Sequence, residues 1–120
     1  MSKLEVYNKS YKKAIEIHKI TMEFPKTEQY GGIADQLRRS SKSIPANIVE
    51  GYGKAPYYKN DFKRMLIYAL GSCDETQLWL EMSKDLEYLN HDKYLIHKQD
   101  YQHIGKMLTN FIKSINNSFY

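Results

Sequence analysis

The C-terminal quarter of the chain carries a largely apolar series that recurs every three or four residues. Its members are Tyr94, His97, Tyr101, Ile104, Leu108, Phe111 and Ile115. This spacing places the side chains on one face of an α-helix, because a helix turns once every 3.6 residues. Asn90 or Asp92 can cap the helix through a side-chain oxygen. Such a helix must bury its apolar face against other elements, which indicates a helical bundle.

Two segments nearer the N-terminus repeat this periodicity. The first expected helix carries a stripe of Leu4, Tyr7, Tyr11, Ala14, His18 and Met22. We expect its remaining surface to hold Lys9, Lys12, Lys13 and Lys19. The second expected helix carries a stripe of Ile33, Leu37, Ser41, Ile44 and Ile48. Phe24-Pro25 should close the first helix, since the residue before proline avoids the α region, and Gly51 and Gly53 should end the second.

The third expected helix runs from near Pro56 to about Leu89 and is apolar on two sides. One stripe consists of Phe62, Leu66, Ala69, Cys73 and Leu80. A different side carries Tyr68, Trp79, Met82 and Leu86. A helix that is apolar on two sides must be buried on two sides. In a chain of 120 residues, we expect the second contact to be another subunit.

These segments predict one all-α domain over residues 1–120. No segment alternates with a period of two, so strands are not required. Three prolines and six glycines also leave little material for the many turns of a β-sandwich. Short connections favour antiparallel neighbours, so we predict an up-down-up-down four-helix bundle.

Pro45 falls inside the second expected helix, between Ile44 and Ile48 of its apolar stripe. Proline lacks an N–H and its ring crowds the carbonyl of Ser41, a defect that costs about 3 kcal/mol or more in a helix interior. Either the helix is kinked near Pro45 and continues, or it is interrupted there and restarts with Ser43 as its cap. We favour a bend that fits the bundle over a binding loop.

The stretches QLRRSSKSIPANIVEGYGK and DFKRMLIYALGSCDETQ carry a family pattern. Its specific part is S-I-P-x-N-I-x-E-G, found here at residues 43–51, with Arg38 and Arg39 upstream and A-L-G-S at residues 69–72 downstream. Over residues 11–115 the chain resembles the four-helix-bundle proteins that are encoded by intervening sequences in bacterial 23S ribosomal RNA genes.

That family is similar to the accessory protein of diversity-generating retroelements, a barrel-shaped homopentamer of such bundles that associates with a reverse transcriptase and with nucleic acid. The resemblance therefore implies a homo-oligomer, by analogy a pentamer, with nucleic acid or a protein as partner. It implies no enzymatic activity. A pentamer would also account for the two apolar sides of the third helix, although nothing in this sequence identifies a reverse transcriptase as the partner.

Five cationic residues form a candidate nucleic-acid site. On a helical wheel, Arg38, Arg39 and Lys42 lie opposite the core stripe of the second helix. Lys63 and Arg64 follow at the start of the third helix. Arginine can donate two hydrogen bonds to phosphate from a planar fork, and lysine adds a point charge, so we predict phosphate contacts here. The alternative is a solvated face, or ion pairs with the acidic second half of a neighbouring subunit.

The charge of the chain is unevenly distributed. Residues 1–64 hold 13 Lys+Arg against 7 Asp+Glu, a balance of +6, and residues 65–120 hold 5 against 7, a balance of −2. This polarity can attract an anionic partner to the first half, or it can pair one subunit with another.

The remaining reactive residue types form no recognisable catalytic or metal pattern. The four histidines lack H-x-x-x-H spacing, so we expect His18 and His97 to find partners within the bundle. Cys73 should be a small core residue whose thiol pKa is raised by the acidic neighbours Asp74 and Glu75. We therefore expect no metal, no cofactor and no catalysis.

Other features of the sequence bear on the cellular compartment of the protein. The single cysteine excludes an intrachain disulfide, and no N-terminal apolar run resembles a signal peptide. The longest apolar stretch, residues 65–70, is far too short to span a bilayer. We expect a cytoplasmic protein with no membrane partner.

The sequence thus predicts a non-enzymatic, homo-oligomeric scaffold, by the resemblance a pentamer, whose basic surface binds RNA or DNA, together with a protein partner or without one. The alternative is a protein–protein interaction adaptor that does not bind nucleic acid.

Overall fold

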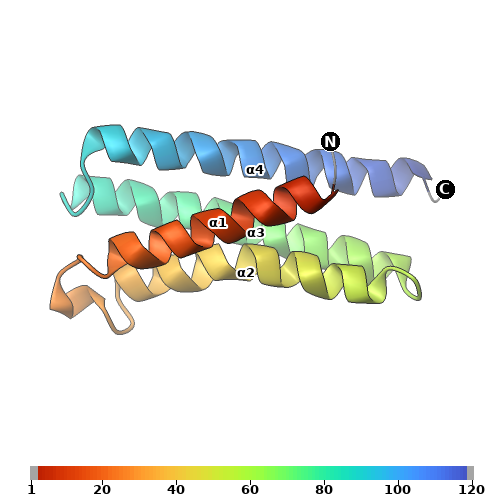
Figure 1. The fold of residues 1–120 in the computed structure, drawn as a ribbon, viewed down its shortest axis with the longest axis horizontal. Helices are drawn as coiled ribbons and strands as arrows, with labels where there is room; N and C mark the ends of the chain where they lie inside the picture. Colours follow the sequence, from red (N-terminus) through yellow and green to blue (C-terminus); the bar gives the residue numbers. More distant parts are fainter. Residues whose placement is uncertain (1–2, 119–120) are drawn as a thin grey trace.

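The computed structural model describes residues 3–118, which form four long helices and one short 3-10 helix (Figure 1). The elements are α1 (Lys3–Thr21), η1 (Lys26–Glu28), α2 (Ile33–Lys54), α3 (Lys59–Asp85) and α4 (His91–Ser118). The described residues contain no strand, as the periodicity predicts. Within the same residues, no helix has a stretch sufficiently long and apolar to cross a lipid bilayer.

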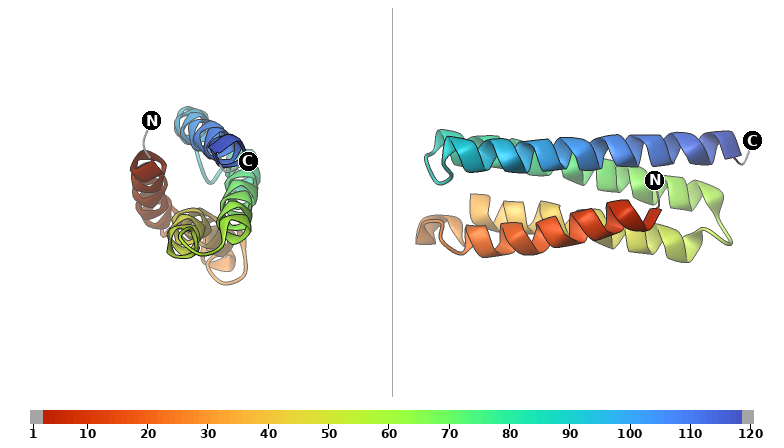
Figure 2. Two further views of the ribbon diagram at one scale, coloured as in Figure 1. Left: turned by 90° about the vertical axis from the view of Figure 1, so that its right-hand side faces the viewer. Right: turned by 45° about the horizontal axis from the view of Figure 1, so that its top comes forward.

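Successive long helices run in opposite directions (Figure 1). Viewed end-on, they follow one another around the bundle in chain order, so that α1 lies diagonally across from α3 (Figure 2). Contacts are extensive between α1 and α2, between α2 and α3, and between α3 and α4, but they are sparse between α1 and α4. The predicted four-helix bundle is confirmed, and the α1–α4 seam is its least packed side.

Most of the predicted apolar stripes form the core. Every member of the stripes predicted for α2 and α4 is buried, as is every member of the first α3 stripe. Aromatic rings fill the end of the bundle where α2 meets α3: Phe62 lies 5.5 Å from Phe111 and 5.7 Å from Tyr52 between ring centroids. The N-terminal cap of α4 is also confirmed, since the side chain of Asn90 accepts the backbone N–H of Lys93 at 2.9 Å.

The stripe predicted for α1 is right only in part: Ala14 is buried and Tyr7 packs against the core, but other members do not. The buried residues of this helix are Val6, Ser10, Lys13, Ala14 and Ile17, followed by Thr21. Tyr11 and Met22, which were expected in the core, are 51% and 59% exposed, and the side chain of Leu4 lies outside the described part of the chain. Ser10 and Thr21 can be buried because each hydroxyl donates to a backbone carbonyl three residues earlier.

The α1–α4 seam is built around Lys13, which was expected on the surface. Its Nζ lies 2.7 Å from Nδ1 of His97, 2.9 Å from a carboxylate oxygen of Asp100 and 3.3 Å from a carboxylate oxygen of Glu16. A lysine ammonium can only donate, so Nδ1 of His97 accepts and the imidazole is neutral. Burial, and next the charge of Lys13, lower the pKa of His97, against the opposing effect of the two carboxylates. His97 thus has the bundle partner that the sequence predicts.

α2 continues without interruption through Pro45, which is buried. The interruption that the sequence left open therefore does not occur, while a bend at Pro45 stays a prediction. The helical turn around the proline is stabilised by Asn47. Its side-chain nitrogen donates to the carbonyl of Ser43 at 2.8 Å and to the hydroxyl oxygen of Ser43 at 2.9 Å. The hydroxyl of Ser72 on α3 donates to the same Ser43 oxygen at 2.8 Å, which fixes the register of α3 against α2.

Gly51 and Gly53 do not end α2, contrary to expectation, because the helix runs through both to Lys54. A Cβ atom on Gly51 would lie 2.9 Å from the ring of Phe62 and 3.3 Å from Met65. Gly51 is therefore required by the close approach of α3. A Cβ atom on Gly53 would meet nothing within 4 Å.

We predict that Gly51→Ala lowers the melting temperature and that Gly53→Ala raises it. Alanine at position 51 overpacks the α2–α3 contact, which typically costs about 1–3 kcal/mol and outweighs the gain in helix propensity. Alanine at position 53 keeps only that gain, about 0.5–1 kcal/mol. Thermal unfolding followed by circular dichroism measures both. Stabilisation by both changes to the same extent would contradict the close approach.

We also predict that the protein loses stability as the pH falls from about 7.5 to 5, and that His97→Gln reduces this loss. A histidine whose pKa is lowered by folding takes up its proton more readily in the unfolded chain, so unfolding is favoured below its ordinary pKa of about 6.5. Glutamine still offers Lys13 an acceptor oxygen but does not titrate. Urea unfolding across this pH range measures the slope, with His91→Gln, an exposed position, as control.

An unchanged slope in His97→Gln, or an equal reduction in His91→Gln, would show that the buried histidine does not couple folding to pH. Asp100 does not interfere with the test, because folding lowers its pKa, and such a group loses its stabilising effect only below its ordinary pKa of about 4.

Candidate nucleic-acid interface

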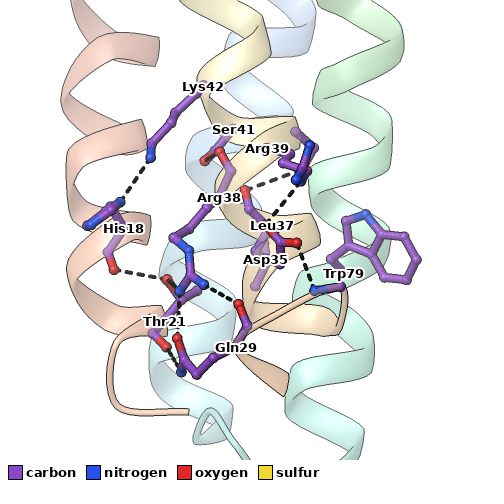
Figure 3. Close-up of polar contacts among 12 residues, drawn as sticks. His18, Thr21, Gln29, Asp35, Leu37, Arg38, Arg39, Ser41, Lys42 and Trp79 are labelled. Carbon is purple, nitrogen blue, oxygen red and sulfur yellow. Dashed lines mark hydrogen bonds and ion pairs between the residues drawn. The ribbon is translucent and has the colours of Figure 1, made fainter. Parts of the chain in front are cut away.

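The first predicted phosphate ligand, Arg38, is already engaged within the bundle (Figure 3). One terminal nitrogen of its guanidinium donates to the hydroxyl of Thr21 at 3.1 Å and to the side-chain oxygen of Gln29 at 3.0 Å. The other donates to the backbone carbonyl of Gln29 at 2.8 Å. Arg38 is half-buried and joins α2 to the end of α1 and to the connection between the two helices.

Gln29 completes this cluster. Its side-chain amide donates to the carbonyls of Thr21 at 2.8 Å and Phe24 at 3.0 Å. The polar groups of the α1–α2 connection thus converge on one arginine and one glutamine. A phosphate group at Arg38 would compete with three acceptors that the fold supplies, so Arg38 is first of all a structural residue.

Arg39 is largely exposed on α2. Its side chain is 73% exposed and pairs with Asp35 one turn earlier at 3.0 Å. The other oxygen of Asp35 accepts the backbone N–H of Gly31 at 2.8 Å, and this hydrogen bond is the main cause of the lowered pKa of Asp35. Exposed ion pairs of this kind contribute only about 0.3–0.5 kcal/mol, so Arg39 can exchange Asp35 for a phosphate at little cost.

Lys42 reaches from α2 to α1, where its Nζ lies 3.0 Å from Nδ1 of His18 (Figure 3). The charge of Lys42 is the main cause of the lowered pKa of His18, followed by burial and by the charge of Arg38. The expected bundle partner of His18 is thereby confirmed. The ammonium of Lys42 remains exposed and carries further N–H donors for an anion.

Lys63 and Arg64 lie elsewhere on the molecule. Arg64 is 54% exposed and pairs with Asp61 at 2.6 Å, and Lys63 is half-buried. The Ser43–Ser72 contact sets Lys63 level with about residue 52 of α2, which is roughly 15 Å along the axis from Lys42 at the helical rise per residue. The structure therefore divides the five predicted residues into an α2 group near the α1–α2 connection and an α3 group near the opposite end of the bundle (Figure 1).

Two exposed lysines of α1 were not included in the predicted site. Lys12 and Lys19 lie on the outer side of that helix, which packs beside α2. The sequence placed both on the surface. Because the core face of α1 was predicted only in part, the sequence did not show on which side of the core face the two lysines lie. Both lie about 100–120° from His18 on the helical wheel, so they are not on the flank of α1 that meets Lys42 of α2.

The described residues offer little for metal or redox chemistry. No three His, Cys, Asp or Glu side chains among them lie close enough together to hold a metal ion. Cys73 is fully buried, and its thiol donates to the carbonyl of Tyr101 at 3.1 Å. Burial raises the pKa of this thiol to about 12, which keeps it protonated near neutral pH.

Comparisons with known proteins agree with this four-helix architecture. The family described as 23S rRNA-intervening sequence protein matches residues 2–110. The chain is also similar to a crystal structure from Bacteroides thetaiotaomicron, described as a protein with unknown function from the S23 ribosomal protein family. The two share 30% identity and a TM-score of 0.82 over 90% of this chain and 98% of the other. A search of curated proteins gives no match.

We predict that Arg38→Ala destabilises the fold and that Arg39→Ala does not. Loss of hydrogen bonds from a charged donor typically costs about 1.5–3 kcal/mol, and here it also leaves Gln29 and Thr21 without their shared donor. Removal of an exposed ion pair should change the free energy of unfolding by no more than about 0.5 kcal/mol. Urea unfolding of the two variants measures the difference, and equal effects would contradict the structural role of Arg38.

Proposed function

The chain belongs to the 23S rRNA-intervening sequence protein family, and from this premise we propose that it is a cytoplasmic, non-enzymatic, homo-oligomeric scaffold whose basic surface binds RNA or DNA. The similarity of the family to the accessory protein of diversity-generating retroelements suggests five copies. A reverse transcriptase or another protein is a further candidate partner on the same ground.

The outer face of α3 supports the homo-oligomer in this proposal. Its first apolar stripe fills the core, and its second side leaves Tyr68, Met82 and Leu86 exposed, with Tyr68 at 52% and Leu86 at 50%. Trp79 is half-buried and donates its indole N–H to Glu75 at 2.9 Å. Exposed apolar side chains gathered on one side of a helix typically mark a protein interface. A second copy of the chain would remove these side chains from water.

The nucleic-acid part of the proposal is supported by the exposed cations. Arg39 and Arg64 are each held only by an exposed ion pair within their own helix, and the ammonium of Lys42 is exposed. Each cation can be presented to a phosphate without unfolding a helix. A symmetric oligomer repeats the group in every subunit, so weak contacts add up when one polyanion spans several copies.

The separation of the two cationic groups favours the alternative function, a protein–protein adaptor. The α2 group and the α3 group lie roughly 15 Å apart along the bundle axis, so one polyanion would need a track that spans both. Arg38 is in addition satisfied internally. An acidic protein that contacts only one group would need no such track. The adaptor is therefore the outcome to expect if nucleic acid does not bind.

Light scattering coupled to size exclusion tests both parts of the proposal. Nuclease-treated protein should elute at a multiple of the chain mass of 14.2 kDa, with five as the multiple suggested by the family resemblance. Addition of a mixed RNA and DNA pool should increase this mass at low salt and not at high salt. A monomer would contradict the scaffold, whereas an oligomer that never takes up nucleic acid would support the adaptor.

We predict that the double change Arg39→Gln with Lys42→Gln weakens nucleic-acid binding and flattens its salt dependence. Each lost phosphate contact should reduce the slope of log K against log salt by about 0.7–0.9. The pair Lys63→Gln with Arg64→Gln tests the α3 group in the same way. Lys106→Gln with Lys113→Gln, two exposed positions of α4, is the control for net charge alone.

Equal effects of all three pairs would mean that only net charge matters and would remove the five residues as a specific site. No effect of the α2 pair, with loss of binding in the α3 pair, would assign phosphate contact to the other end of the bundle. Arg38 is left unchanged in these variants, because its loss is expected to alter the fold.

A further inference from the structure

A second exposed apolar surface lies across α1 and α2. Tyr11, Ile15 and Met22 are exposed on the α1 side, and Val49 is exposed on α2. The contact of His18 with Lys42 fixes the register of these antiparallel helices and places Tyr11 level with Val49. We refer to Tyr11, Ile15, Met22 and Val49 as the α1–α2 patch.

The charges beside this patch are mainly positive. On a helical wheel, Lys12 and Lys19 lie within about 60° of Ile15, and both are exposed. Lys42 borders the patch from α2. Glu16 follows Ile15 on α1 and lies one turn from both Lys12 and Lys19, but its carboxylate is directed to the α1–α4 seam, where it contacts Lys13 and His97.

The exposed side of α3 has the opposite charge over its C-terminal half. Leu78, Met82 and Leu86 form an exposed row, here termed the α3 stripe. Four carboxylates lie within about 60° of Leu78 on the helical wheel: Asp74, Glu75, Glu81 and Asp85. The cation in this half of the helix, Lys84, lies 3.4 Å from a carboxylate oxygen of Asp85 and 4.6 Å from the ring of Tyr94, so it offsets one of the four carboxylates and leaves the stripe with a net negative border.

Each surface is therefore apolar in its centre and charged at its border. The border charge is positive at the α1–α2 patch and negative at the α3 stripe. A contact of the α3 stripe with itself would bring eight carboxylates together, four from each copy, and a contact of the α1–α2 patch with itself would bring its lysines together. The pairing of patch with stripe avoids both repulsions and buries apolar side chains on each side.

We propose that the α1–α2 patch of one copy packs on the α3 stripe of the next copy, with Lys12 and Lys19 facing the carboxylates of α3. This inference rests on the homo-oligomer of the proposed function and names its interface. Most of the patch lies on α1, diagonally across the bundle from α3, so one copy can hold a neighbour at each of the two surfaces (Figure 2). Such a contact is heterologous and either closes into a ring or continues as a filament.

Two blocking variants test the pairing. Ile15→Glu places a charge in the α1–α2 patch, and Leu78→Glu places the same charge in the α3 stripe. Both positions are exposed, so the fold should be retained, which circular dichroism checks. Each variant alone should run as a monomer. A one-to-one mixture should form a dimer that grows no further, because only one intact patch and one intact stripe remain to combine.

The matched control is Ile96→Glu, an exposed isoleucine of α4 outside both surfaces, which should keep the oligomer of the unchanged protein. A mixture that stays monomeric would overturn the pairing. An Ile15→Glu variant that keeps the full oligomer would do the same and would indicate a contact of α3 with itself.

The failure of this inference is distinguishable from the failure of the proposed function. If the unchanged protein is an oligomer and both variants leave it intact, only the assignment of the interface is lost. If the unchanged protein is a monomer, the homo-oligomer itself is wrong, and the two surfaces would be left for a different protein partner.

Discussion

The close approach of α2 and α3 determines most of the bundle's geometry. The side chains along their contact are small or share hydroxyl groups: Ser40 accepts from Thr76, and Ser43 accepts from Ser72, each at 2.8 Å. Gly51 continues the same line where Phe62 comes nearest. Hydroxyl pairs satisfy one another in the interior, so they can replace apolar side chains without leaving polar atoms unpaired. The register of the bundle follows from these contacts, and with it the distance between the two groups of candidate phosphate ligands.

The opposite side of the bundle is closed in a different way. α1 and α4 have few contacts, and the buried amine of Lys13 holds them together through His97, Asp100 and Glu16. Breaking a buried ion pair typically costs several kcal/mol, because a charge is left without a partner. The geometry of the Lys13 cluster thus specifies which face of α1 turns inward, a choice that the apolar residues of α1 alone do not make.

Sequence periodicity was sufficient where one face of a helix is clearly more apolar than the rest. The stripes of α2 and α4 are of this kind, and so is the first apolar stripe of α3. Periodicity was right only in part for α1, because Ser10 and Thr21 are satisfied by their own backbone and Lys13 by a different helix. The candidate cations were chosen from helical wheels, which give the side of a helix but not its axial register. Their division into two groups depends on Ser43 meeting Ser72, a contact between residues far apart in the sequence.

The charge balance of the α1–α4 seam has a consequence for how the molecule meets others. With His97 neutral, Lys9 and Lys13 offset Glu16 and Asp100, so the seam contributes no net charge. The long-range field then arises from the outer surfaces, where the exposed cations of α1 lie diagonally across the bundle from the carboxylates of α3. The molecule carries a transverse electric dipole, and dipoles of this kind orient partners during diffusion, before any surface has touched. Salt would therefore slow the encounter of two copies even where it leaves their apolar contact unchanged.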